Sequence, residues 1–214
     1  KGNYYGEASN PVTIIKGIKT MANTNTEVIY HKGVSLVTSQ NKDSVELSKN
    51  ILKDIESADV VIFVGGLDAT WEGEESNKMR AHNVVDGFFG GDRTKIELPE
   101  VQQNALREIS KTGKPIIFVL LAGSAISFNG LEDKLDGILA AWYPGQRGGD
   151  AVADVLFGKY NPAGRLPITF YSSTNELGDF ENYNMRAGKG LTYRYYNGEA
   201  LFPFGHCHSI GWSR

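Results

Sequence analysis

Cysteine is nearly absent from this chain, which carries Cys207 and no other. A single cysteine cannot form a disulfide within the chain, so a buried core has to hold the fold. Positive charge is not in excess either, since 22 Lys and Arg against 25 Asp and Glu give a formal net charge of -3. That balance gives no electrostatic footprint for nucleic acid or for an anionic membrane. The apolar runs are too short to cross a bilayer, so we expect no membrane span.

The usual cofactor and metal motifs are missing as well. The sequence has no GxGxxG after a strand, no GxxxxGKS/T and no HExxH, so we expect no cofactor. His206 and His208 alternate around Cys207, a pattern that allows either a metal site or a solvated tail. No further ligand is evident, so we favour the tail and predict no metal. Ser124 follows an apolar run, but its neighbours do not match a nucleophile elbow.

The pattern that is present is an alternation of strands and helices. Apolar runs predict strands at residues 60–64, 115–121 and 137–143, with shorter strands at 27–31 and 166–171. Helical spacing predicts helices at residues 10–21, 43–57, 99–113 and 148–157, the first of them starting at Asn10-Pro11. Such alternation implies βαβ units. The predicted fold is therefore α/β, a three-layer α/β/α sandwich with a mostly parallel sheet, and 214 residues suit a single domain of this kind.

An acidic cluster follows the strand at 60–64. Glu72, Glu74 and Glu75 come directly after Trp71, where ligands meet the chain in doubly wound α/β proteins. Glycoside hydrolysis needs two carboxyl groups, one of them protonated to assist the leaving group. Three glutamates in a polar loop can equally be solvated charge, and spacing alone favours that interpretation. Trp71 can be a platform for a sugar ring or a packing residue, and the sequence does not choose between them.

Several motifs then occur in a recognisable order. They are Gly2-Asn3-Tyr4-Tyr5-Gly6, Glu72-Gly73-Glu74, Gly91-Asp92-Arg93, Trp142-Tyr143-Pro144-Gly145-Gln146, Asn161-Pro162-Ala163-Gly164-Arg165-Leu166-Pro167 and Phe202-Pro203-Phe204-Gly205. The order resembles the C-terminal α/β-sandwich domain of glycoside hydrolase family 3, across residues 1–214. The acidic loop looks most like β-xylosidases and β-glucosidases of Bacteroidetes. We interpret the Trp142-Tyr143-Pro144 segment as structural.

The resemblance implies a retaining, exo-acting β-glycosidase that hydrolyses terminal β-linked sugars of oligosaccharides. In that family an aspartate of an N-terminal (β/α)₈ barrel is the nucleophile, and the sandwich supplies the general acid/base glutamate. Glu72 matches that glutamate best by its position after the strand, and Glu74 is the second choice. This implied role reverses the preference for solvated charge. Asp92 and Arg93 match a Gly-Asp-Arg motif, and we expect them to be a buried pair that anchors the loop.

The chain also departs from the family pattern. It begins at Lys1 without a start methionine, and the barrel and the first strand of the sandwich are missing, so we expect a piece of a longer protein. The resemblance implies a secreted or periplasmic location and leaves glucosidase and xylosidase open. A non-catalytic carbohydrate-binding or protein-interaction domain of the same fold is the alternative. We expect residues 75–90 to be mobile, with Phe88-Phe89 exposed when the barrel is absent.

Overall fold

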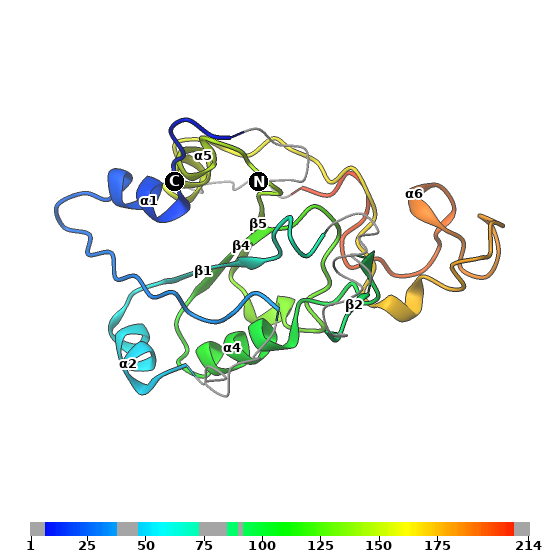
Figure 1. Cartoon of the computed structure of the whole chain (residues 1–214), viewed down its shortest axis with the longest axis horizontal. Helices are drawn as coiled ribbons and strands as arrows, with labels where there is room; N and C mark the ends of the chain where they lie inside the picture. The colour runs from blue at the N-terminus through cyan, green and yellow to red at the C-terminus, as the bar shows by residue number, and fades with distance from the viewer. Residues whose placement is uncertain (1–6, 38–46, 73–84, 90–91, 208–214) are drawn as a thin grey trace, which may run out of the picture.

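The computed structural model describes residues 7–37, 47–72, 85–89 and 92–207 (Figure 1). Its elements are α1 (Ile14–Met21), α2 (Lys49–Ser57), β1 (Val61–Gly66), β2 (Phe88–Phe89), β3 (Asp92–Arg93), α4 (Glu100–Ser110), β4 (Ile116–Leu121), η1 (Glu132–Lys134), β5 (Gly137–Ala140), α5 (Gly148–Leu156), η2 (Thr174–Glu176) and α6 (Thr192–Tyr195), where η marks a 3₁₀ helix.

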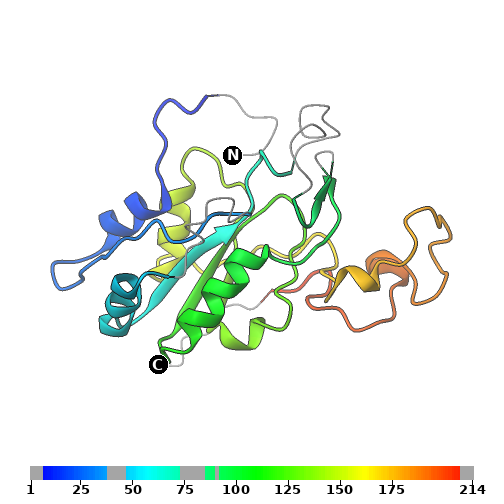
Figure 2. The ribbon, with the colours of Figure 1, turned by 60° about the horizontal axis from the view of Figure 1, so that its bottom comes forward.

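A parallel sheet with the strand order β1-β4-β5 forms the middle layer of the described residues. Phe118 of the central strand β4 is paired in register with Phe63 of β1 and with Ile138 of β5. Helices α1 and α5 lie on one face of the sheet, and α2 and α4 lie on the other (Figures 1 and 2). The arrangement confirms the predicted α/β class, the three-layer sandwich and the mostly parallel sheet.

The core is centred on β4 and the helix that precedes it. Ile116, Phe118 and Val119 are at most 1% exposed. The Phe118 ring stacks on Phe63 with 5.3 Å between centroids and meets Phe128 edge-on at 5.2 Å. Because apolar side chains fill both faces of the strand, β4 is a continuous apolar run in the sequence, which is why its position could be predicted.

Two helices start later than predicted because a capping side chain sets each boundary. Thr13 Oγ1 accepts a hydrogen bond from Lys16 N (3.3 Å), so α1 begins after Asn10 and Pro11 rather than at them. Ser48 Oγ accepts a hydrogen bond from Ile51 N (3.3 Å) and starts α2, while residues 43–46 of that predicted helix lie outside the described residues. Such caps satisfy amide groups that have no partner within the helix.

Two predicted strands are wrong as regular strands. Residues 27–31 are irregular, and Ile29 and Tyr30 are 47% and 60% exposed. Residues 166–171 contribute an isolated bridge between Phe170 and Phe202. An apolar run shows that a segment suits a strand, but it does not show whether a partner strand lies beside it.

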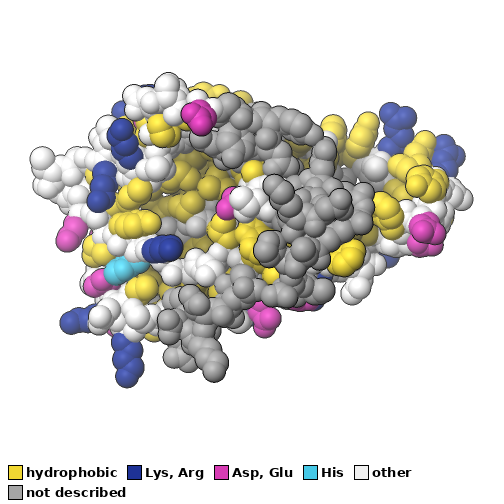
Figure 3. Space-filling model, viewed as in Figure 1, with side chains coloured by type: hydrophobic (Ala, Val, Ile, Leu, Met, Phe, Trp, Pro, Cys, Tyr) yellow, Lys and Arg dark blue, Asp and Glu magenta, His cyan; other side chains and the backbone are white. Residues whose placement is uncertain are grey.

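One edge of the sheet is open within the described part of the chain. There β1 pairs with β4 and has no strand on its other side. Val64 of β1 is 42% exposed, and Figure 3 shows hydrophobic side chains gathered over this edge between α1 and α2. Natural proteins protect such edges with charge, with bulges or with another segment of chain.

Residues 174–200, which we call the C-terminal lobe, project from the sandwich (Figures 1 and 2). Short elements, η2 and α6, are its regular structure. Its aromatic side chains are often exposed: Phe180 is 95% exposed and Tyr183 is 87% exposed. The lobe therefore contrasts with the buried aromatic cluster around β4.

Candidate active site

The loop that begins after β1 turns back toward the sheet. Gly66 adopts φ +112°, and Leu67 N then donates to the Leu121 carbonyl of β4 (2.6 Å). Asp68 closes the turn, because its side chain accepts from Thr70 N (2.9 Å) and its carbonyl accepts from Glu72 N (3.3 Å). The loop therefore brings Glu72 to the carboxyl edge of the parallel sheet, where α/β proteins bind their ligands.

A buried glutamine holds the base of this loop. Gln102 of α4 is 1% exposed; its Oε1 accepts from Gly66 N (2.8 Å) and its Nε2 donates to the Gly66 carbonyl (2.7 Å). The same Nε2 donates to the Leu36 carbonyl (2.5 Å). The role of Gln102 was not predicted from the sequence. A signal was available, because Gln102 lies four positions before Leu106 on the predicted buried stripe of the helix, where an amide needs internal partners.

Glu72 is bound by three donors from the loops that follow β4 and β5. Gly123 N donates to Oε2 (2.5 Å), the Ser124 hydroxyl donates to Oε1, and the Tyr143 hydroxyl donates to Oε2. The site is tightly filled, because a Cβ added at Gly123 would lie 2.9 Å from Tyr143 Cε2 and 3.0 Å from Glu72 Oε2. The predicted candidate residue therefore lies where three loops of the sheet meet.

Tyr143 and Ser124 were not predicted to belong to this site. Tyr143 was interpreted as structural, and Ser124 was considered only as a nucleophile. Burial, and then the hydrogen bond to the negatively charged Glu72, raise the pKa of Tyr143 above its usual range. The tyrosine therefore remains a neutral hydroxyl that donates to the carboxylate. A pattern in one segment cannot find such a partner, because Glu72 and Tyr143 are 71 positions apart.

Arg93 binds the residues that surround Glu72. Its Nη1 donates to Ser124 Oγ (2.9 Å) and to the Ala125 carbonyl (2.8 Å), and its Nη2 donates to the Glu97 carbonyl (3.2 Å). Burial lowers the pKa of Arg93, and the charges of Glu72 and Glu97 oppose that shift. The expectation that Asp92 is buried with it is wrong, because Asp92 is exposed. Arg93 binds carbonyl and hydroxyl oxygens of the neighbouring loops instead.

Trp71 lies half-buried against Phe88, with 5.3 Å between the ring centroids. Phe88 belongs to the short β2–β3 ribbon and is 7% exposed, so its expected exposure is wrong, whereas Phe89 is 60% exposed. The contact supports the packing role for Trp71, the alternative to a sugar platform. Glu74, Glu75 and residues 76–84 of the expected mobile loop lie outside the described residues.

The stretch around Cys207, for which a metal site was the less favoured alternative, makes ordinary contacts. His206 packs on the Phe202 ring at 5.2 Å, and Cys207 Sγ lies 3.7 Å from the Pro162 carbonyl oxygen, while His208 lies outside the described residues. Across the described ranges, no cluster of three or more His, Cys, Asp and Glu side chains is arranged to hold a metal ion. The helices within the described ranges include none that is long and apolar enough to cross a membrane.

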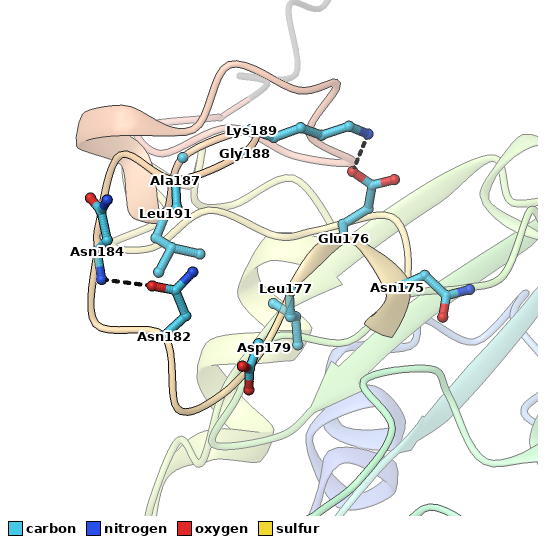
Figure 4. A pocket seen from close by; sticks show the side chains of 12 residues that line it. Asn175, Glu176, Leu177, Asp179, Asn182, Asn184, Ala187, Gly188, Lys189 and Leu191 are labelled. Carbon is cyan, nitrogen blue, oxygen red and sulfur yellow. Dashed lines mark hydrogen bonds and ion pairs between the residues drawn. The ribbon is translucent and has the colours of Figure 1, made fainter.

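A separate pocket of about 320 Å³ lies in the C-terminal lobe (Figure 4). Its two carboxylates are already bonded: Glu176 pairs with Lys189 Nζ (2.7 Å), and Asp179 accepts from Glu181 N (3.0 Å). Burial, and then the hydrogen bond to Glu176, raise the pKa of Tyr196 to about 12 beside this pair. Both carboxylates of the pocket therefore have partners within the lobe.

Comparison with known proteins identifies the family. A model of the glycosyl hydrolase family 3 C-terminal domain matches residues 1–210, and the chain belongs to this family. A xylan 1,4-beta-xylosidase of Xylanibacter ruminicola is 48% identical over 155 residues, which cover 72% of this chain and 17% of that protein. A periplasmic beta-glucosidase of Salmonella typhimurium is 30% identical over 227 residues, covering 94% of this chain and 28% of that protein.

Solved structures agree with these relatives. A family 3 exo-beta-xylosidase in complex with a xylobiose aziridine probe superposes with a TM-score of 0.76 at 28% identity, covering 96% of this chain and 25% of that one. The resemblance that the motifs carried is confirmed. The chain thus spans between 17% and 28% of the length of these relatives.

Proposed function

We propose that this chain is the domain of a retaining, exo-acting β-glycosidase that supplies the general acid/base glutamate. The observation that carries the proposal is the acidic loop itself, which begins at the carboxyl edge of the sheet in a chain that belongs to family 3. Retaining hydrolysis needs a second carboxylate about 5–5.5 Å from the acid. In this proposal the second carboxylate comes from an N-terminal barrel of the same parent protein, and the domain meets β-linked oligosaccharides together with that barrel.

The loop offers Glu72 and Glu74 as acid/base candidates, ranked in that order by the sequence. Support for Glu72 comes from its position at the meeting point of the three loops. Against it, each of its two oxygens already accepts a hydrogen bond from this domain. Trp71 is the proposed sugar contact, although its packing on Phe88 supports a structural role.

The relatives support a class of substrate and a location. Relatives named as β-xylosidases and as β-glucosidases both align with this chain, so we propose a terminal β-linked xylose or glucose as the substrate residue. One relative is named as periplasmic, which supports a periplasmic or secreted location.

The open edge of β1 bears on the extent of the domain. Exposed apolar residues beside an edge strand that has no outer partner among the described residues suit the addition of one more strand. We propose that residues 1–214 form the family 3 C-terminal domain except for one strand, which the parent protein would add at this edge.

The test compares the parent protein with this chain on an aryl β-xyloside and an aryl β-glucoside. We expect the parent to hydrolyse at least one of them with retention, and the purified 214-residue chain to show negligible turnover. If the parent hydrolyses neither and instead only binds oligosaccharides, the proposal fails in favour of a non-catalytic binding domain. Robust turnover by the isolated chain, free of full-length enzyme, would also contradict it.

A further inference from the structure

We propose that Glu72 is a positioning residue that fixes the start of the acidic loop, and that it is not the proton donor. This inference rests on the proposed function of the loop and reverses the predicted ranking of Glu72 above Glu74. It starts from one observation: both carboxylate oxygens of Glu72 accept hydrogen bonds from groups of this domain.

The direction of these hydrogen bonds is fixed by the donors. A backbone N–H can only donate, so Gly123 must donate to Oε2. Ser124 Oγ accepts from Arg93 Nη1 (2.9 Å), which leaves its own hydrogen for Oε1. Oε2 therefore holds two donors, which fill its lone pairs in the plane of the carboxylate, and Oε1 is engaged by Ser124 of the same domain. A general acid instead needs its proton on an oxygen that faces the departing group of the substrate.

The same contacts explain how Glu72 holds the start of the acidic loop in place. They tie the loop after β1 to the loops after β4 and β5, and Arg93 continues the network to the carbonyl groups of Ala125 and Glu97. A larger residue at position 123 would crowd the carboxylate, since a Cβ there would lie 3.0 Å from Oε2. Correct placement of a reacting group matters because a shift of about 1 Å can lower a rate about 100-fold.

Replacement of Glu72 by glutamine distinguishes a positioning role from a role as the general acid. The amide of Glu72→Gln can keep Oε toward Gly123 and Tyr143 and turn its NH₂ to Ser124 Oγ, so an anchor is largely preserved. We expect Glu72→Gln to lower kcat/KM of the parent enzyme less than about 10-fold, and Glu72→Ala to lower it roughly 100-fold. Both variants should change hydrolysis of an aryl β-glycoside and of a disaccharide by similar factors, because an anchor acts irrespective of the leaving group.

Glu74 provides the matched comparison. We expect Glu74→Gln to slow the disaccharide, which has a poor leaving group, about 10²–10⁴-fold, and to affect the activated aryl substrate far less. Azide should restore turnover of Glu74→Ala and not of Glu72→Ala. In that reaction azide attacks the anomeric carbon of the glycosyl-enzyme and displaces the nucleophile carboxylate, which yields a β-glycosyl azide and free enzyme.

Tyr143→Phe adds a readout that a purely structural role would not produce. If the tyrosine acts through Glu72, its loss should reduce kcat and should have little further effect in a Glu72→Ala background, while folding measured by circular dichroism is unchanged. The inference is overturned if Glu72→Gln shows the strong leaving-group dependence and Glu72→Ala is rescued by azide; the proposed function of the loop would then stand. If variants of neither glutamate show this pattern, the acid lies elsewhere and the proposed function itself fails.

Discussion

The sandwich and the C-terminal lobe use aromatic residues in opposite ways. In the sandwich, Phe118 and Phe128 are fully buried and contact each other edge-on. In the lobe, Phe180 and Tyr183 are almost fully exposed. Burial of an aromatic ring stabilises a fold by several kcal/mol, whereas an exposed ring contributes little to folding. The stability of the chain therefore resides in the sandwich, and the lobe aromatics are available for other contacts.

The lobe is held by short-range polar contacts instead. Asn182 Oδ1 accepts from Asn184 N (3.0 Å), and Asn184 Oδ1 accepts from Arg186 N (3.1 Å). Tyr196 donates to Glu176, which also pairs with Lys189. Contacts of this kind are worth about 1 kcal/mol or less when they are exposed. The comparison teaches that the two regions should respond very differently to the same kind of mutation.

The largest expected effect is at the centre of the sheet. Phe118→Ala should lower the free energy of unfolding by about 3–5 kcal/mol, because it removes a fully buried ring and leaves a cavity between Phe63 and Phe128. Urea denaturation of the full chain measures this. The control is Val64→Ala on β1, where a 42% exposed side chain should cost less than about 1 kcal/mol. A loss below 1 kcal/mol for Phe118→Ala would contradict the claim that the buried rings of the sandwich stabilise the chain.

The next effect concerns the buried amide that holds the loop. Gln102→Leu keeps the volume roughly constant but leaves Gly66 N and two carbonyl groups without their partner. We expect a loss of about 2–3 kcal/mol, since unsatisfied buried groups cost about 1–3 kcal/mol each and the loop can relax. The control Asn104→Leu lies on the exposed side of the same helix, and its effect should stay within about 0.5 kcal/mol. Equal losses in the free energy of unfolding for the two substitutions, measured in urea, would show that Gln102 does not hold the base of the loop.

How well the sequence predicted each element depends on how strongly burial shapes its local pattern. β4 and α4 were located because burial on the sheet imposes a strong apolar pattern. The predicted starts of α1 and α2 were too early, because the local pattern did not identify Thr13 and Ser48 as the caps. Segment 27–31 has the composition of a strand, but a strand also requires a neighbour, which no local pattern reveals.

The candidate site was predictable only in part. Glu72 was singled out because it follows a buried strand and stands in a family motif, and its catalytic role stays a prediction. Its partners Ser124 and Tyr143 come from other loops, and only the folded sheet brings them together. Arg93 was found as an anchor, but its partners are carbonyl and hydroxyl oxygens rather than Asp92. Contacts between distant segments need the three-dimensional structure.

A smaller effect is expected where the lobe joins the sandwich. Glu97 accepts hydrogen bonds from Thr174 N (2.9 Å) and Thr174 Oγ1 (2.8 Å). Burial acts to raise the pKa of Glu97, but these hydrogen bonds outweigh it and hold the pKa below 4.5. Because the folded-state pKa is lowered, this stabilisation is present above about pH 4.5 and is lost as the pH falls through the folded-state pKa.

The measurement is the stability of wild type and Glu97→Gln between about pH 7 and pH 3. We expect the variant to lose about 1 kcal/mol at pH 7 and to show a shallower decline in acid. Hydrogen exchange should increase in the lobe and not in β4. Glu56→Gln on the exposed side of α2 is the control and should keep the wild-type decline. An unchanged acid slope in Glu97→Gln would show that Glu97 does not link the two regions.

The smallest expected effect completes the comparison with the same chemical change as the largest. Phe180→Ala removes a ring that is 95% exposed, so the free energy of unfolding should change by less than about 0.5 kcal/mol. Urea denaturation under the conditions used for Phe118→Ala measures it, and Tyr183→Ala, with an 87% exposed ring, serves as a second lobe variant. A loss above 1 kcal/mol in either variant would mean that the lobe aromatics do support the fold. Near-zero values would leave them as rings that are available for contacts outside the chain.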